Sequence, residues 1–355
     1  AFKAMAAKRK KAKSSIIAAI AGDQADAESM FVLKAMMQRL GSVNIDCRQD
    51  GAKIGGSRAG YLFNSTIAGI DDADALLIVG SNPREEAAVL NARIRRNWLS
   101  TGMPVGVVGV DSDLTYDTKH LGDDPAILSA ILDGSHKFST VLKRAKQPMI
   151  IIGMGALSRE DGAAILATTR QIAEAYGVVA KDWNGFNVLH NAAARVGGLD
   201  IDFIPGKGGL DLEGMYKAAE NKKLDFVWLL GADEVDMDRL SDAFIVYQGH
   251  HGDKGAHGAD VVLPGAAYTE KDGIYVNTEG RVQYANRAAY PPGEAKEDWA
   301  IIRAFSGHIN KSIGLDSLTD VRAALFEAFP HFAERDTIAS TKWSKFGGRG
   351  KMDSS

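Results

Sequence analysis

Cysteine is nearly absent from this chain: Cys47 is the single one among 355 residues. One thiol forms no disulfide within the chain, and an iron–sulfur cluster is held by several cysteines. Both features are therefore excluded for this chain alone, and we expect a reducing compartment, the cytosol or an organelle matrix. A catalytic thiol needs a base, and no histidine is nearer in sequence than His120. We therefore interpret Cys47 as a small structural thiol.

Long hydrophobic runs and an excess of one charge are also missing. No apolar run reaches the roughly 18 to 20 residues that cross a bilayer. The formal net charge is −3, from 42 Lys and Arg against 45 Asp and Glu, which argues against a dedicated nucleic-acid binder. The first residues, AFKAMAAKRKKAK, include neither an initiator methionine nor a signal-peptide core. We expect a segment of a longer chain, with the basic run 8–13 at the solvated end of a helix or linker.

The pattern of apolar runs and helical periods predicts the fold class. The length suits two or three domains, and 45% of the residues are hydrophobic. Buried strands are expected at 15–21, 74–80, 104–110, 149–153, 178–181, 224–231 and 244–248. Helices are expected between them, and also at 298–310 and 318–329. Such alternation predicts an α/β fold with mostly parallel, doubly wound sheets.

Two glycine-rich stretches, 44–69 and 184–209, lack this periodicity, so we expect ordered connectors there and not core elements. The last residues, GGRGKMDSS, also lack a core pattern. Gln147-Pro148 precedes a fresh apolar run and predicts a seam between modules.

One strand–helix junction is sharply specified. Asn82 can cap a helix, Pro83 suits its first position, and Glu85 stands where a capping box places its acid. The amides of such a junction can hold an anion. Against an anion, two glutamates already occupy the positive end of the helix.

A second junction imitates a dinucleotide fingerprint. Gly153 and Gly155 follow an apolar run, a helical pattern comes next, and Asp182 follows the next apolar run. However, Ser158 stands where the third glycine belongs, and Asp182 comes later than the usual spacing of about 20 residues. Tight turns in any α/β fold use glycines in this way, so the pattern alone does not establish a nucleotide site.

Two polar clusters resemble metal sites without matching one. The acids of residues 233–238 do not follow the spacing of an EF-hand loop, and they suit the first turn of a short helix. His250, His251 and His257 lie in a glycine-rich loop and lack an evident further ligand for zinc. We expect no metal site, no cofactor-binding residue and no catalytic residue among them.

Residues 258–283 combine a strand, a proline stop and a hairpin. The apolar run 259–263 ends at Pro264-Gly265, and the segments 273–276 and 281–284 flank Asn277-Thr278-Glu279-Gly280. Asn277 and Gly280 are able to supply the positive φ of a tight connection. Thr269, Glu270, Asn277, Glu279 and Arg281 give the segment polar tips.

Three long segments together carry a family resemblance. DALLIVGSNPREEAAVLNARIRRNWL (74–99), IIIGMGALSREDGAA (150–164) and ADVVLPGAAYTEKDGIYVNTEGRVQ (259–283) resemble the large iron–sulfur subunit of respiratory complex I, NADH:quinone oxidoreductase. This is the 75-kDa type, also called the G subunit. The similarity lies in its carboxyl-terminal molybdopterin-oxidoreductase-like region and covers residues 14–346, in an alphaproteobacterial or mitochondrial style.

The resemblance implies several properties of domains and cofactors. It implies one discontinuous α/β domain of residues 14–44 and 146–335 and an inserted α/β domain of residues 45–145. The ends at 1–13 and 336–355 are expected to be flexible. Iron–sulfur clusters are expected in an amino-terminal part that is missing here, and we do not expect a molybdopterin. In the formate-dehydrogenase branch the metal-binding residue follows a segment similar to residues 44–47. The resemblance implies that Cys47 matches a non-ligating position and that the ligand's neighbourhood is Asp50-Gly51-Ala52. There Asp50 could bind molybdenum, as a carboxylate does in some relatives.

The hypothesis that follows is a non-catalytic structural domain with a degenerate molybdopterin cleft. It would belong to the peripheral arm of an enzyme that passes electrons from NADH to quinone. The partners expected are other peripheral-arm subunits, with no nucleic acid and no direct membrane insertion. The location expected is the cytoplasmic face of the bacterial inner membrane, or the matrix side in mitochondria. Two alternatives stay open: an active molybdopterin-dependent oxidoreductase using Asp50 or Cys47, and a nicotinamide-dependent dehydrogenase using Gly153, Gly155 and Asp182.

Overall fold

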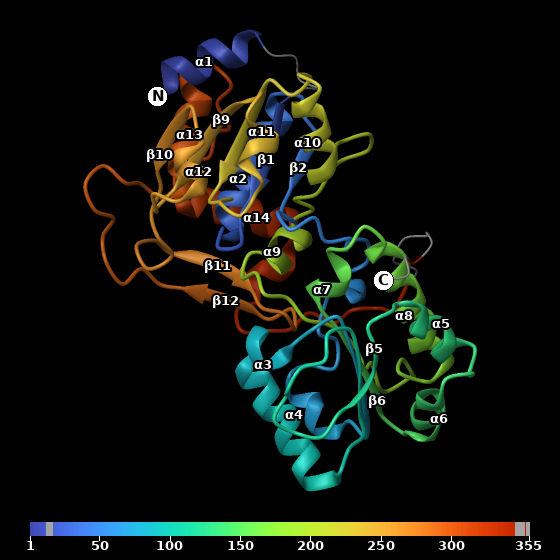
Figure 1. Ribbon diagram of the computed structural model, residues 1–355. Helices are drawn as coiled ribbons and strands as arrows, with labels where there is room; N and C mark the ends of the chain where they lie inside the picture. Colours follow the sequence, from blue (N-terminus) through green and yellow to red (C-terminus); the bar gives the residue numbers. More distant parts are fainter. Residues whose placement is uncertain (12–16, 345–351, 353–355) are drawn as a thin grey trace. The chain divides into compact units, whose positions relative to one another are not determined.

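The computed structural model describes residues 1–11, 17–344 and 352, and it divides the chain into two compact units (Figure 1). Neither unit is one continuous segment. The first unit contains residues 1–51, 192–277 and 281–339. The second contains residues 52–191 and 278–280, together with the described residues from 340 onward.

The first unit is built on a five-stranded parallel sheet in the order β10-β9-β8-β1-β2 (Figure 1). Its strands are β1 (Ile17–Ala21), β2 (Asn44–Asp46), β8 (Phe226–Leu230), β9 (Phe244–Gly249) and β10 (Val261–Pro264). The three central strands are apolar along almost their whole length, as expected for a parallel sheet covered on both faces. The chain order reverses between β1 and β8, so this pair forms the topological switch point of the sheet.

Helices cover both faces of this sheet. On one face, α2 (Ala27–Arg39) packs against α13 (Asp298–His308) and α14 (Leu318–Ala328). On the other, α10 (Leu212–Glu220) and α11 (Met237–Leu240) close a core over alternate strand residues such as Ile20 and Leu229. The short helices α9 (Arg195–Asp200) and α12 (Lys254–His257) and the 3₁₀ turn η4 (Pro330–Ala333) complete the unit. Two layers of helices around a parallel sheet confirm the expected fold class.

The start of α2 shows how the sequence fixes these elements. Asp26 has an extended backbone, and its side chain accepts a hydrogen bond from the Ser29 amide at 2.7 Å. This N-cap satisfies an amide that the helix itself leaves unpaired. At the other end Gly41 has φ of 74°, a left-handed conformation that ends the helix.

The expectation of flexible ends is wrong for the residues that can be described. Phe2–Lys11 forms α1, whose Phe2 ring lies 5.4 Å from the ring of Phe305, and Met5 is fully buried. Near the other end, the amide of Asp336 donates to the Val282 carbonyl at 2.7 Å. The rest of the expected flexible ends, at 12–13, 345–351 and 353–355, lies outside the described residues.

The second unit also contains a five-stranded parallel sheet, here in the order β5-β4-β3-β6-β7. Its strands are β3 (Ala75–Val79), β4 (Val105–Val108), β5 (Lys119–Gly122), β6 (Pro148–Ile152) and β7 (Phe186–Val188). The chain order reverses between β3 and β6, which makes this pair the switch point of the second sheet.

Helices again lie on both faces of the sheet. On one face, α4 (Ala88–Thr101) packs over side chains such as Leu76 and Ile78. On the other, α5 (Ala126–Leu132) packs against α6 (Lys137–Arg144) and α8 (Gly162–Ala175). The remaining short helices are α3 (Pro83–Glu86), α7 (Met154–Leu157), η2 (Arg58–Gly60) and η3 (Ala68–Asp72).

The expected domain boundary near residue 146 is wrong, because β6 pairs with β3 from Ala75↔Pro148 to Val79↔Ile152. Residues 146–191 therefore belong to the second unit, and residues 45–51 stay with the first because β2 pairs with β1. The two glycine-rich stretches are not free of core elements either. Each contributes a buried three-residue strand, β2 in the first stretch and β7 in the second.

The strand 259–263 and the hairpin form as the sequence predicted. The strand is β10, and β11 (Gly273–Val276) pairs antiparallel with β12 (Val282–Ala285). Of the two residues able to supply a positive φ, only Gly280 does so, with φ of 84°. Asn277 instead uses its side chain, whose Oδ1 accepts a hydrogen bond from the Arg281 amide at 2.9 Å.

Candidate functional site

Each sheet has a cavity at the carboxyl ends of its strands, next to its switch point. This is where open α/β sheets bind their ligands. The first cavity has a volume of about 150 Å³, and we call it the acidic cavity after its carboxylates: Asp23, Asp233, Glu234, Asp253 and Asp298. The second has a volume of about 330 Å³, and we call it the Glu86 cavity after the residue on its wall beside Ser81 and Asn82. The acidic cavity lies wholly within the first unit, and the Glu86 cavity lies wholly within the second.

Close backbone approach opens the acidic cavity at the switch point. Gly22 follows the last residue of β1, and its amide donates to the Leu230 carbonyl at 2.9 Å. A Cβ on Gly22 would overlap the carbonyl of Gly231. Only glycine lets the two strands end side by side here. Asp23 then follows at the cavity wall.

A buried ion triad forms the floor of the acidic cavity. The Lys271 ammonium contacts the Asp26 carboxylate at 2.7 Å and also the Asp298 carboxylate. All three residues are at most 5% exposed. Burial opposes the charge of Lys271, but the two carboxylates outweigh burial and raise the pKa of Lys271 well above its ordinary value. The lysine is therefore charged at neutral pH and held by both acids.

The negative charge of the other acids of the cavity is less well balanced by nearby cations. Burial, followed by neighbouring Asp253, raises the pKa of Asp233 to about 6. Burial likewise raises the pKa of Asp23, although Arg195 opposes the shift. His250 adds no lasting positive charge, because burial and then His251 lower its pKa below the ordinary value. The wall facing the cavity is therefore negative at neutral pH.

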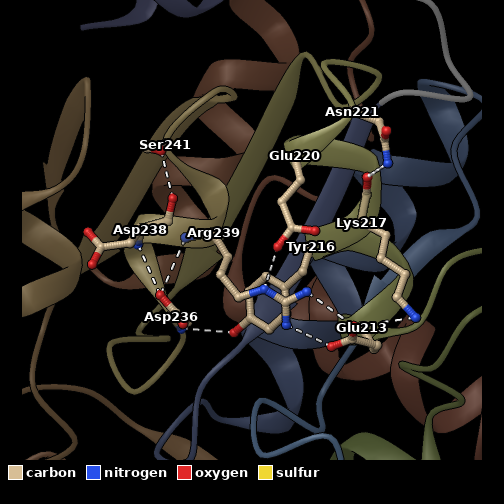
Figure 2. Close-up of polar contacts among 9 residues, drawn as sticks. All are labelled: Glu213, Tyr216, Lys217, Glu220, Asn221, Asp236, Asp238, Arg239 and Ser241. Carbon is tan, nitrogen blue, oxygen red and sulfur yellow. Dashed lines mark hydrogen bonds and ion pairs between the residues drawn. The ribbon is translucent and has the colours of Figure 1, made fainter.

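The acidic run 233–238 leads into α11, whose polar contacts Figure 2 shows from Asp236 onward. Asp236 caps this helix by accepting hydrogen bonds from the amides of Asp238 and Arg239, which confirms the expected role of the acidic run. Arg239 forms ion pairs with Glu213 at 2.8 Å and Glu220 at 2.6 Å, both on α10. The network ties α11 to α10 and so fixes the loop that carries Asp233 and Glu234.

Of the two candidate metal ligands, Cys47 is buried and Asp50 is paired with an arginine. Cys47 is 1% exposed, and burial followed by the nearby Asp46 raises the pKa of its thiol to about 12. A thiol with this pKa is protonated at neutral pH and is a poor nucleophile. Asp50 accepts a hydrogen bond at 2.9 Å from Arg195, which is itself 1% exposed.

The Glu86 cavity contains its own anion. Glu86 accepts hydrogen bonds from the Asn82 amide at 2.7 Å and from the Ser81 hydroxyl at 2.9 Å. The capping-box expectation is thus met by Glu86 and not by Glu85, and Asn82 makes no side-chain cap. Helix formation is interrupted at Ala87, which separates α3 from α4. The donors that could hold a phosphate are occupied by a carboxylate of the same chain.

The dinucleotide fingerprint is explained by packing. A Cβ on Gly153 or Gly155 would approach the Gly80 carbonyl to 2.8 Å, so these glycines allow β6 and α7 to pass close to the end of β3. No strand forms at 178–181; the next strand is β7, and Asp182 is exposed in the turn before it. Asp182 is therefore absent from the carboxyl edge, and the Gly153–Asp182 juxtaposition that a nicotinamide site needs does not form.

The remaining polar candidates have structural partners. Glu270 accepts from the Ala267 amide at 3.0 Å, and Glu279 accepts from the Ile67 amide at 2.9 Å. His250 and His251 line the acidic cavity, whereas His257 is exposed at the end of α12. Within the described part of the chain, no group of three or more His, Cys, Asp or Glu side chains is arranged to hold a metal ion. In the same part, no helix combines the length and the apolar character needed to cross a bilayer.

Sequence reasoning missed the two charged side chains that organise the cavities, Lys271 and Glu86. Lys271 lies in a polar segment without any signal of burial, and its partners come from distant parts of the chain. Glu86 was identified as one of two acids at a helix start. The sequence does not indicate that Glu86, and not Glu85, accepts the hydrogen bonds of Ser81 and Asn82.

Comparisons with known proteins place this geometry in a family. The family model described as molybdopterin oxidoreductase matches residues 1–308. Among curated relatives, the G subunit of NADH-quinone oxidoreductase from Rickettsia conorii is 44% identical over 353 residues, which are 99% of this chain and 51% of that protein. The corresponding protein of Rickettsia prowazekii is 44% identical over 98% of this chain and 50% of its own length. The expected resemblance to this subunit is confirmed, and the chain spans about half the length of the curated relatives it matches.

Solved structures share the fold at low sequence identity. A chain of the formyltransferase/hydrolase complex from Methylorubrum extorquens, solved with methylofuran, aligns with a TM-score of 0.59 and 16% identity. The alignment covers 87% of this chain and 95% of that one. Acetylene hydratase from Pelobacter acetylenicus aligns with a TM-score of 0.56 and 12% identity, over 87% of this chain and 58% of that one. At these identities the likeness concerns the fold alone.

Proposed function

Because this chain belongs to the molybdopterin oxidoreductase family, we propose that it is a non-catalytic structural region of an NADH:quinone oxidoreductase that keeps the fold of that family without its cofactor chemistry. The observation that carries the proposal is the 44% identity to the G subunit of this enzyme over 99% of the chain. The partners are other subunits of the peripheral arm. The complex passes electrons from NADH to quinone through iron–sulfur clusters held outside these residues, at the cytoplasmic face of the bacterial inner membrane or the matrix side in mitochondria.

The residues do not suit a molybdenum–pterin group, which supports the structural role. Cys47 is buried and protonated, and Asp50 is paired with Arg195. The pterin cofactor also carries phosphate. The acidic cavity meets phosphate with carboxylates, and the Glu86 cavity already uses Ser81 and Asn82 to hold Glu86. Among the described residues, the lysine and arginine that line these cavities are paired with carboxylates of the chain, Lys271 with Asp26 and Asp298, and Arg159 with Asp161.

The proposal is tested on the intact complex. The chain, tagged within its natural polypeptide, should co-purify with the peripheral-arm subunits and with NADH:quinone oxidoreductase activity. Elemental and pterin analysis of that complex should find iron and no stoichiometric molybdenum. The substitutions Asp50→Asn and Cys47→Ala should leave NADH:quinone turnover unchanged wherever the complex assembles.

Two results would overturn the proposal. One is molybdenum present at one atom per chain and lost in Asp50→Asn, which would establish a working molybdopterin enzyme. The other is recovery of the chain without any peripheral-arm subunit, which would separate it from this complex.

A further inference from the structure

We propose that the acidic cavity binds an organic cation rich in N–H donors, a guanidinium head group, in place of the anionic ligand that its position at a switch point would suggest. The inference is independent of the role in NADH oxidation. It stands on the charge of the cavity wall, on unpaired acceptors among the lining residues, and on an aromatic ring at the mouth.

The first observation is the balance of charge. Five carboxylates and one lysine, Lys271, line the cavity, and Lys271 is occupied by Asp26 and Asp298. Asp233, Glu234 and Asp253 form no ion pair with any residue that the structure describes. Burial, and after it the neighbouring Asp253, raises the pKa of Asp233. A cation entering the cavity would relieve the repulsion, whereas a phosphate would add to it.

The second observation concerns two buried carboxamides. Gln49 is 4% exposed and Gln248 is fully buried, and both line the cavity. Gln248 uses its Nε2 as a donor to Asp298 at 2.8 Å. The Oε1 atom of each glutamine has no hydrogen-bond partner among the described residues. A buried acceptor without a donor costs free energy, so a ligand that brings N–H groups can supply the hydrogen bonds that the described residues do not make with these two oxygens.

The third observation is Tyr268, which lines the cavity and is 56% exposed. An exposed tyrosine ring beside carboxylates attracts a cation over its face, and guanidinium does this best among protein cations. The guanidinium is planar and presents five donors at fixed angles, so it can serve carboxylates and carboxamides together. A cavity of about 150 Å³ has room for such a head group and a few water molecules.

Two sources supply this chemistry: the arginine side chain of a partner subunit, or a free guanidino compound. The whole chain, at pH 7.5, is titrated with methylguanidinium, agmatine and the peptide Gly-Arg-Gly, and binding is followed by calorimetry and NMR. Saturable binding near millimolar Kd is expected. Tighter binding of the peptide indicates a partner's arginine, and tighter binding of agmatine indicates a free ligand. Tetramethylammonium, which has the charge without N–H donors, should bind at least ten times more weakly.

Two variants locate the binding. Asp233→Asn removes charge and Gln49→Met removes one acceptor at nearly constant volume, and each should weaken binding of methylguanidinium about five-fold or more. Asp242→Asn, an exposed acid away from the cavity, is the matched control and should not change it. The proposal is overturned if no guanidino compound binds at 10 mM, if tetramethylammonium binds equally well, if Asp233→Asn and Gln49→Met leave the affinity unchanged, or if pyrophosphate binds this cavity in preference.

Discussion

The switch points of the two sheets occupy the same position in the fold, but their side chains differ in charge and in hydrogen bonding. At the switch point of the first sheet lies the acidic cavity, where carboxylates outnumber cations and buried acceptors lack donors. At the switch point of the second sheet, Glu86 fills the place of an anion with a group of the chain itself. The comparison teaches that a fold fixes where a ligand could bind, while a few side chains decide whether an anion, a cation or nothing is accepted there.

The largest effect is expected at the floor of the acidic cavity. Lys271→Met leaves Asp26 and Asp298 buried without their cation, which should cost about 3 to 5 kcal/mol in the free energy of unfolding. Urea denaturation measures the loss. Lys254→Met, an exposed lysine of α12, is the control and should change little. A loss below about 1 kcal/mol for Lys271→Met would mean that the triad does not form.

The pH dependence of stability should come from the first unit. Burial, and then neighbouring Asp26, raises the pKa of Glu28 to about 7, although its carboxylate accepts from Ile274 and Arg322. Because this pKa is higher in the folded than in the unfolded state, stability should rise as pH falls from about 8 to about 5. The gain amounts to roughly 3 kcal/mol at most.

Glu28→Gln tests this directly, because the amide cannot titrate. Urea midpoints between pH 5 and pH 8 should depend less on pH in this variant than in the parent chain. Glu327→Gln, an exposed position of α14, serves as the control. An unchanged slope in Glu28→Gln would show that Glu28 is ionised in the folded protein throughout this range.

A smaller effect is expected where the second sheet supplies its own anion. Glu86→Ala frees the Asn82 amide and the Ser81 hydroxyl, which should lower stability by about 1 kcal/mol. Added pyrophosphate should restore the midpoint in Glu86→Ala and not in the parent. Glu85→Ala, at the neighbouring exposed position, should behave as the parent. Equal responses of all three proteins to pyrophosphate would refute the idea that Glu86 occupies an anion position.

The smallest effect is expected at the network of Figure 2. Arg239 is partly exposed, so its ion pairs with Glu213 and Glu220 contribute little to global stability. Arg239→Ala should lower the melting temperature only slightly, and yet increase amide exchange in residues 233–238 by loosening α11. Arg239→Lys keeps the charge without the forked geometry and should be intermediate. Unaltered amide exchange in Arg239→Ala would show that this network does not stabilise the cavity wall.

Much of the fold could be predicted from the sequence, because long apolar runs and capping residues act locally. The strands at 74–80, 149–153 and 224–231 are of this kind. Short strands could not be predicted in the same way. β2 and β7 have three residues each, and their pairing partners, not their own composition, make them strands. The predicted domain boundary near residue 146 was wrong for the same reason, because only the pairing of β6 with β3 assigns the residues after 146 to the second unit.

The site was less accessible to sequence reasoning than the fold. The prediction that Cys47 is structural agrees with its burial, and Asp50 was a candidate on sequence grounds although its partner Arg195 was not predicted. The Lys271 triad, however, joins residues from three separate segments, and the sequence of one segment does not indicate that it contacts the others. The ends of parallel strands meet in space whatever their order in the chain, so chemistry at a switch point depends on topology that the sequence does not display.

The parallel pairing of Ile17 with Phe226 also constrains how the protein is made. During synthesis β1 leaves the ribosome long before its central neighbour β8, and at about 5 to 20 residues per second it waits roughly ten seconds or more. The sheet of the second unit, β3 to β7, is translated within that interval and can fold first. The two strands already emerged then present unpaired edges to the cell, and chaperone contact is expected at that stage of translation.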